Sequence, residues 1–209
     1  RKRCRDAACE TRLCHCRRLA SLTLATKASA MERNFPEALA HTLAFEGGWA
    51  NNPNDPGGAT MKGITHRTYA HYLGRDVSHD ELRAIPDDHL AEIYRKRYWD
   101  ACRCSDLPDG LDLAAFDTAV NAGPAQAARL LQRIVGVPAD GAIGPKTIAA
   151  VNEYVSAQGL HALIEAYTEA RHNFYRLLPT YVHFGEGWRK RATHAGELAT
   201  RLVDKDKTA

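Results

Sequence analysis

The chain has 209 residues, of which 44% are hydrophobic and 25% are charged. This length allows one compact domain or two small ones, and no run of residues approaches the roughly 18 apolar positions of a membrane span. The net charge of +3 suits an encounter with an anionic surface but identifies no partner. Beyond residue 30 there is no basic stripe interleaved with aromatic residues, so nucleic-acid binding is not expected.

The first thirty residues form a basic, cysteine-rich stretch without helical periodicity. A secretory signal is one interpretation, with an apolar stretch at residues 19–25 and small residues at 28–30 as the cleavage site. We favour a second interpretation, a disordered or translated upstream tail with Met31 as the true start. Because the stretch holds four of the six cysteines, the rest of the chain is not expected to depend on a disulfide framework. These four are Cys4, Cys9, Cys14 and Cys16.

Residues 35–46 form the first predicted helix, and this helix ends in a glutamate. Phe35, Leu39 and Leu43 recur every four residues, and Glu46 falls on the same apolar stripe. The glycines at 47 and 48 can end the helix there. Since apolar surroundings favour the protonated form of a carboxylic acid, Glu46 is a candidate general acid. A helix-terminal glutamate exposed to solvent is the alternative.

Turn-forming residues dominate the next segment, in which Asn-Asp-Pro-Gly-Gly at 54–58 precedes Ala-Thr-Met-Lys-Gly-Ile-Thr at 59–65. This composition predicts a loop that leads into short extended pieces, as in a small β-hairpin. Asp55 and Thr60 lie nine and fourteen residues after Glu46. They are therefore near enough in sequence to fold back over it.

The stretch from Glu46-Gly-Gly-Trp49 through residues 54–60 to Gly-Ile-Thr65 resembles the signature of the glycoside hydrolase 108 family. These are N-acetylmuramidases found as phage endolysins and as bacterial enzymes linked to protein export. The resemblance implies that Glu46 is the catalytic acid. The order Glu, Asp, Thr is also similar to the triad of phage-type lysozymes, with a comparable but not identical spacing. This similarity makes Asp55 and Thr60 candidates to orient or activate a water molecule, and Thr65 is a weaker candidate for the same role. Trp49, which lies in the same stretch, is a candidate for substrate binding.

Glycosidic cleavage needs one carboxyl group to protonate the leaving oxygen and a second group to act as nucleophile or to stabilise the oxocarbenium-like transition state. Glu46 suits the first role. Asp55 suits the second, although an Asp-Pro pair is equally typical of a turn. The separation of the two carboxyl groups distinguishes retention from inversion and cannot be read from a sequence.

Two further helices are predicted between residues 78 and 100. Ser78 and Glu81 have the spacing of a capping box, and residues 87–99 place Leu90, Ile93, Tyr94 and Tyr98 on one face. Tyr98 is a candidate platform for stacking a sugar ring. The alternative is a place in the core, where aromatic residues at helical spacing are more often found.

Residues 111–122 predict a strong helix that stops at Gly123, with Leu113, Phe116 and Val120 on one side. Asp117 and Asn121 lie one turn apart on this helix. In the resembling family, the Asp-x-x-x-Asn helix belongs to the catalytic module. Asn121 is therefore a candidate to bind substrate or to support the floor of the site, and a helix cap or a buried structural role fits it equally.

After Pro124 the pattern changes to helices separated by glycine-containing turns. Leu-Gln at 131–132 followed by Asp-Gly-x-Ile-Gly-Pro-x-Thr at 140–147 looks like peptidoglycan-binding helical modules, and a plain helix-turn-helix is the physical alternative. Residues 158–178 predict a long helical stretch. The Phe-x-x-Gly-Trp-x-x-Arg segment at 184–191 is also like the family's C-terminal part, and we expect it to precede a last helix.

The expected fold is mainly α. A lysozyme-like helical module at 31–123, with a small β-hairpin after its first helix, is followed by a helical module at 124–209 that packs on it without a linker. The expected activity is hydrolysis of the bond between N-acetylmuramic acid and N-acetylglucosamine, with Glu46 as acid. Two alternatives stay open: a lytic transglycosylase, and a non-catalytic wall-binding or secretion-accessory protein.

The expected partner is the glycan strand of peptidoglycan, bound by a monomer that does not insert into membranes. The ten histidines are scattered, and neither a zinc pattern nor a nucleotide-binding glycine motif occurs, so no metal or cofactor is expected. A phage endolysin would stay in the cytoplasm until a holin releases it to the periplasm and cell wall. A secretion signal in residues 19–30 would remove the need for a holin.

Overall fold

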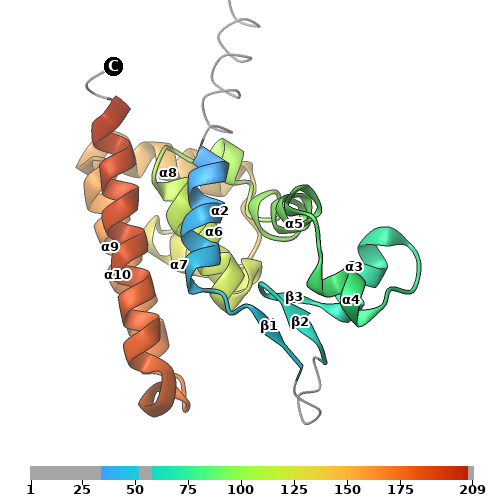
Figure 1. Ribbon diagram of the computed structural model, residues 1–209. Helices are drawn as coiled ribbons and strands as arrows, with labels where there is room; N and C mark the ends of the chain where they lie inside the picture. Colours follow the sequence, from blue (N-terminus) through green and yellow to red (C-terminus); the bar gives the residue numbers. More distant parts are fainter. Residues whose placement is uncertain (1–33, 52–57, 207–209) are drawn as a thin grey trace, which may run out of the picture.

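The structure is a computed structural model that describes residues 34–51 and 58–206. These residues are mainly helical, as the sequence predicts, and Figure 1 shows a long pair of helices on one side and a small sheet with two short helices on the other. The elements in chain order are α2 (Phe35–Phe45), β1 (Trp49–Ala50), β2 (Thr60–Met61), β3 (Ile64–Thr65), α3 (His66–Leu73), α4 (His79–Arg83), α5 (Asp87–Tyr94), the π-helical turn η2 (Arg95–Trp99), the 3-10 turn η3 (Cys104–Asp106), α6 (Leu111–Ala122), α7 (Pro124–Ile134), α8 (Pro145–Gln158), α9 (Leu160–Arg176) and α10 (Tyr181–Asp206).

Helix α6 lies at the centre of the fold. Every residue from Leu111 to Ala119 is buried, so the helix is surrounded by other elements on all sides. The predicted one-sided stripe of Leu113, Phe116 and Val120 is therefore too narrow. A helix that is covered on all sides needs apolar or paired residues on every face, and α6 meets this need with apolar residues and with buried polar residues such as Asp117 that have partners.

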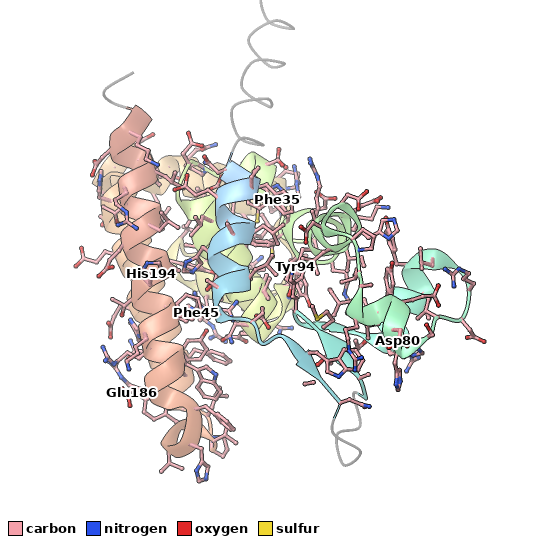
Figure 2. The ribbon with its side chains drawn as sticks, viewed as in Figure 1. Phe35, Phe45, Asp80, Tyr94, Glu186 and His194 are labelled. Atoms are coloured by element: carbon pink, nitrogen blue, oxygen red, sulfur yellow. The ribbon has the colours of Figure 1, made fainter. Side chains whose placement is uncertain are left out.

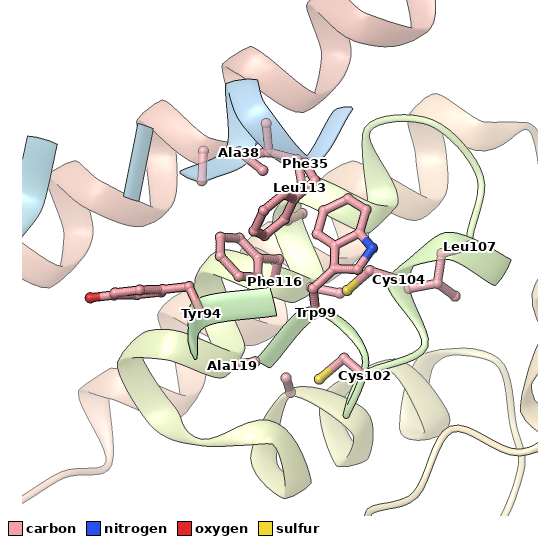
Figure 3. Close-up of a cluster of buried hydrophobic side chains, with 14 of the residues drawn as sticks. Phe35, Ala38, Tyr94, Trp99, Cys102, Cys104, Leu107, Leu113, Phe116 and Ala119 are labelled. Carbon is pink, nitrogen blue, oxygen red and sulfur yellow. The ribbon is translucent and has the colours of Figure 1, made fainter. Parts of the chain in front are cut away.

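An aromatic cluster packs α2 and η2 against α6 (Figure 3). The ring centroid of Phe35 lies 5.3 Å from that of Trp99 and 5.7 Å from that of Phe116, both in edge-to-face geometry. Such aromatic pairs contribute about 0.5–1.5 kcal/mol each beyond their burial. Tyr94 borders the same cluster but points its hydroxyl group away from it. Packing of the Tyr94 ring against the core thus fixes the position of its hydroxyl group, which lies outside the core.

The predicted hairpin is present as part of a three-stranded antiparallel sheet with the order β1-β2-β3. Thr60 pairs with Ala50 on one side and with Thr65 on the other. The tight β2-β3 turn has a positive φ at Lys62 (46°) and at Gly63 (75°). A positive φ is uncommon for a side chain such as lysine, so this turn is held by its surroundings.

Helices α4 and α5 correspond to the two helices predicted between residues 78 and 100, whereas α3 was not predicted. Ser78 and Glu81 form the expected capping box at the start of α4, with each side chain bonded to the other residue's backbone N–H group. Helix α5 continues into η2, which ends at the fully buried Trp99.

Gln132 organises the turn between α7 and α8. Its amide nitrogen donates to Asp140 Oδ1 at 2.7 Å, and its amide oxygen accepts from the Gly141 N–H group at 2.9 Å. The Gly141 φ of 87° suits glycine. The Leu-Gln and Asp-Gly motif of the sequence therefore holds a turn in this fold.

The long helical stretch predicted at 158–178 corresponds to α9, which starts after a break at Gly159. Helix α10 starts at Tyr181, so the 184–191 segment lies inside the last helix, and the prediction that it precedes that helix is wrong. Gly185 and Gly187 make the segment a weak helix by propensity, but packing against α9 overrides this preference. Within the described ranges, none of the helices combines the length and apolar composition needed to cross a membrane.

Candidate active site

Glu46 stands where α2 ends. The helix stops at Phe45, and Glu46 has extended backbone angles (φ −83°, ψ 141°) while its N–H group still donates to the Leu43 carbonyl. The predicted end of the helix is thus one residue too late. Figure 2 shows Phe45 at this end of α2, between α10 and the sheet. The side chain of Glu46 is 21% exposed, which leaves its carboxyl group accessible.

A cleft of about 540 Å³ opens at this point. Three elements line it: the end of α2, the end of α6, and the first half of α10. Among the described residues that line the cleft, Glu46 is the one carboxylic acid. The lining residues are Phe45, Glu46, Val120, Asn121, His183, Phe184, Gly187, Trp188 and Arg191.

Arg191 of α10 holds the Glu46 carboxylate. Its Nη1 atom donates to Glu46 Oε1 at 2.9 Å. The other edge of the same guanidinium group faces Asp117 of α6, with Nε at 2.9 Å and Nη2 at 2.8 Å from Oδ1. A planar guanidinium group can bridge two carboxylates in this way, whereas an ammonium group is a single point charge. Arg191 therefore links the cleft to the core.

Asp117 is the buried centre of an ionic cluster. Its carboxylate pairs with Arg191 and, at 2.7 Å, with Arg171 of α9, and it accepts a hydrogen bond from the Thr42 hydroxyl at 3.0 Å. Burial by itself would raise the pKa of Asp117, but the two guanidinium groups outweigh burial and hold that pKa well below its usual range. The carboxylate is thus charged and fixes both arginines.

The β2-β3 turn lies next to the Oε2 atom of Glu46. The Tyr94 hydroxyl donates to the Lys62 carbonyl at 2.9 Å and so fixes the turn. A Cβ atom on Gly63 would lie 3.0 Å from Glu46 Oε2 and 2.5 Å from the Tyr94 oxygen. Only a residue without a side chain fits between these two groups. Gly63 therefore keeps the carboxyl group of Glu46 in place without covering it.

Asn121 lies in the cleft, as expected for a residue that contacts substrate. The Tyr175 hydroxyl donates to Asn121 Oδ1, and Arg171 Nε donates to the Tyr175 oxygen at 2.6 Å. The orientation of the Asn121 amide is therefore set by the same arginine that pairs with Asp117.

Among the described residues, the other predicted site residues are not among those that line the cleft; they are Trp49, Thr60, Thr65 and Tyr98. Thr60 lies half-buried in β2, and Thr65 caps α3 by accepting from the Thr68 N–H group. The Arg83 guanidinium lies 4.3 Å from the ring centre of Trp49 and covers that face of the ring. Tyr98 packs against the Tyr94 ring at 5.5 Å. Asp55 lies outside the described residues.

The comparisons with known proteins identify the family of the chain. The family model described as Glycosyl hydrolase 108 matches residues 39–123, and the model described as Predicted Peptidoglycan domain matches residues 126–193. The solved structure of SagA from Brucella abortus is 38% identical, with a TM-score of 0.70, and the match covers 82% of this chain and 96% of SagA.

The chain belongs to the glycosyl hydrolase 108 family. As a member of it, the protein is a glycosidase that acts on peptidoglycan. No curated protein matches the chain.

In this glycosyl hydrolase 108 member, both matched segments contribute to one cleft. Glu46 and Asn121 come from the first segment, whereas Trp188 and Arg191 come from the second. Sequence reasoning missed the role of Arg191, although the Gly-Trp-x-x-Arg pattern at 187–191 marked the segment as part of the resemblance. The signal that could have found it is the helical spacing of residues 184, 187, 188 and 191, which puts them on one face.

Proposed function

We propose that this glycosidase hydrolyses the bond between N-acetylmuramic acid and N-acetylglucosamine, with Glu46 as the general acid. One observation carries the proposal: among the described residues lining the cleft, Glu46 is the one that can donate a carboxyl proton. Glycosidic cleavage requires such a donor at the leaving oxygen.

We propose separate roles for the two carboxyl oxygens of Glu46, and the contacts of this side chain support them. Arg191 donates to Oε1, so Oε2 is the oxygen that carries the proton and gives it to the glycosidic oxygen. As the proton leaves, Glu46 becomes a carboxylate that the guanidinium group already faces. An interaction that strengthens as charge develops lowers the barrier to reaction, because it stabilises the transition state more than the bound substrate.

Asp55 remains our proposed second group, and Thr60 our proposed partner in orienting the attacking water. Support comes from the elements that flank the 51–59 connection. Strand β1 begins three residues after Glu46, and the β2-β3 turn places Gly63 against the Glu46 carboxyl group. The connection thus begins a few residues after the acid and ends a few residues before Gly63, which lies against it. The Asp55 carboxylate would then stabilise the oxocarbenium-like transition state or activate the water.

The test is the loss of turbidity of purified peptidoglycan, measured with the native protein and three variants. We expect Glu46→Gln to lower the rate by roughly 10²–10⁴-fold, the usual contribution of a positioned acid, while still binding peptidoglycan. Asp55→Asn should also lower it strongly, and Thr60→Ala less. Glu37→Gln is the matched control, because Glu37 lies half-buried in the first turn of the same helix, where its side chain pairs with Lys205 and does not line the cleft.

Two results would overturn the proposal. Clearing by Glu46→Gln at the native rate would exclude Glu46 as the acid, and binding without clearing by the native protein would favour an accessory role. Mass spectrometry of the released sugars identifies the reaction. Reducing N-acetylmuramic acid ends are expected from hydrolysis, whereas anhydro-sugar ends would show a lytic transglycosylase.

A further inference from the structure

One face of helix α10 carries aromatic rings along the cleft. Phe184, Gly187, Trp188 and Arg191 follow the i, i+3, i+4, i+7 spacing of a single helix face, and all four line the cleft. Phe184 is 57% exposed, which is unusual for a large apolar side chain. This face, which we call the α10 aromatic face and define as Phe184, Gly187 and Trp188, leads directly to the arginine that holds Glu46.

The Trp188 ring is held in place from two sides. Its centroid lies 5.7 Å from that of Phe184 and 5.3 Å from that of Tyr175, with interplanar angles of 35° and 33°. A half-buried indole that is fixed in this way is a preorganised flat surface, so little conformational entropy is lost when a ligand stacks on it.

Gly187 has no structural reason to be glycine. It lies inside a helix, where glycine is less stable than alanine, and its backbone does not have a positive φ. A Cβ atom at this position would meet no heavy atom of the protein within 4 Å. By contrast, a Cβ on Gly185 would collide with the Tyr181 ring, and one on Gly196 with the Thr168 hydroxyl. A glycine that the fold does not require keeps space open at the cleft surface.

The position of this face relative to Glu46 suits an extended chain of sugar rings. With a rise of 1.5 Å per residue, Trp188 lies about 4.5 Å and Phe184 about 10.5 Å along the helix axis from Arg191. The α10 aromatic face thus runs along the cleft away from Glu46, and its length corresponds to about two sugar rings. It carries no carboxylate, and flat apolar rings match the C–H face of an uncharged pyranose.

We propose that the α10 aromatic face is a binding subsite for an N-acetylated amino sugar of the glycan strand, with one ring stacked on Trp188 and its edge lying over Gly187. The inference rests on the proposed function and names where the strand runs. All three residues belong to the segment that matches the Predicted Peptidoglycan domain. That segment therefore binds the strand inside the catalytic cleft, next to the bond that is cut.

The binding experiment uses the full chain with Glu46→Gln, so that the ligand is not cleaved, and glycan strands freed of their stem peptides as the probe. Tryptophan fluorescence reports on the subsite, because Trp99 is fully buried and Trp49 lies under Arg83. We expect the strands to change the emission of this protein. Adding Trp49→Phe should keep the change, and adding Trp188→Phe should remove it.

Gly187→Ala separates binding from folding. The added methyl group favours the helix and meets no protein atom, so the Tm should stay the same or rise. It occupies the space of the sugar, so the Kd for the strands should rise at least tenfold. Glu186→Ala is the matched control: Glu186 is exposed, pairs with Lys190, and points outward from α10 (Figure 2). It should leave the Kd unchanged.

Each outcome decides one point. If Gly187→Ala and Trp188→Phe bind the peptide-free strands as tightly as the parent, or if binding requires the stem peptides, the subsite is excluded. If Gly187→Ala and Trp188→Phe clear peptidoglycan as fast as the native protein, the subsite is excluded and the proposed function is retained. If the native protein binds strands through the α10 aromatic face but cleaves no glycosidic bond, the proposed function is excluded and the subsite is retained.

Discussion

Arg191 donates a hydrogen bond to the carboxylate of Glu46 across 145 residues of sequence. The same guanidinium group pairs with the buried Asp117, so the position of the acid in the cleft is coupled to an ionic cluster in the core. Stability and activity are therefore expected to respond together to changes at some residues and separately at others.

Replacing Arg191 should distinguish its role in orienting Glu46 from the effect of its positive charge. Arg191→Lys keeps the positive charge, but a single ammonium group cannot bridge Glu46 and Asp117 as the guanidinium does. We expect the rate of peptidoglycan clearing to fall at least about tenfold with a small loss of stability, whereas Arg191→Gln should also destabilise the fold by about 3–5 kcal/mol. Full activity of the lysine variant would contradict an orienting role.

Asp117 should control stability at acid pH. The folded-state pKa of this carboxyl group is depressed, so its contribution is present above the unfolded-state value of about 3.9 and is lost as the pH falls below it. Asp117→Asn removes the charge that holds two buried arginines and should cost about 3–5 kcal/mol at neutral pH. Urea unfolding from pH 2 to 7 should show this cost shrinking toward the acid end, and a cost that does not vary with pH would exclude the ionic explanation.

Asp112 should show the opposite pH dependence. Burial raises the pKa of this carboxyl group to about 7, against the hydrogen bond that it accepts from Asn34. Because the folded-state pKa is raised, the contribution is complete below about pH 4 and is lost as the pH rises to about 7, by up to about 4 kcal/mol. Asp112→Asn should therefore gain stability relative to the native protein over this window. Asp76→Asn, on the surface, serves as the control, and parallel stability curves for Asp112→Asn and the native protein would refute the prediction.

Gly63 should tolerate no side chain, for two reasons that a second glycine can separate. Gly63 and Gly74 both have a positive φ, 75° and 67°, which costs other residues about 1–2 kcal/mol. A Cβ on Gly74 would meet nothing within 4 Å, whereas one on Gly63 would press on Glu46 and Tyr94. Both alanine variants should lose similar backbone stability, and Gly63→Ala should in addition lose most of its activity. Equal activities of the two variants would show that the turn does not position the acid.

Local patterns and the family resemblance were sufficient to predict most of the helices and two of the cleft residues, but neither α3 nor the first part of α10. Glu46 became a candidate through its place on the apolar stripe at a glycine helix stop and through the family resemblance, and Asn121 because the resembling family has an Asp-x-x-x-Asn helix in its catalytic module. The surroundings of Glu46 were predicted less well. Its side chain was placed by helical register, but Glu46 has left the helix, so its closest partner is the guanidinium group of Arg191 instead of apolar walls.

The C-terminal half of the site could not be predicted, because it depends on contacts between segments far apart in the chain. Gly185 and Gly187 give residues 184–191 a low helix propensity, and no local pattern indicates that α10 lies across the cleft from α2. The burial of α6 on all sides was likewise set by which helices surround it.

The place of α10 across the cleft also limits how this architecture can evolve. Exchange of whole domains can give an enzyme a new target when catalysis and recognition lie in separate units. Here a recombination junction near residue 124 would replace α9 and α10, and so remove Arg191, the partner of Glu46, together with Arg171, the other arginine that pairs with Asp117. Specificity is therefore expected to change by single substitutions along α10, with residues 39–123 and 126–193 inherited together.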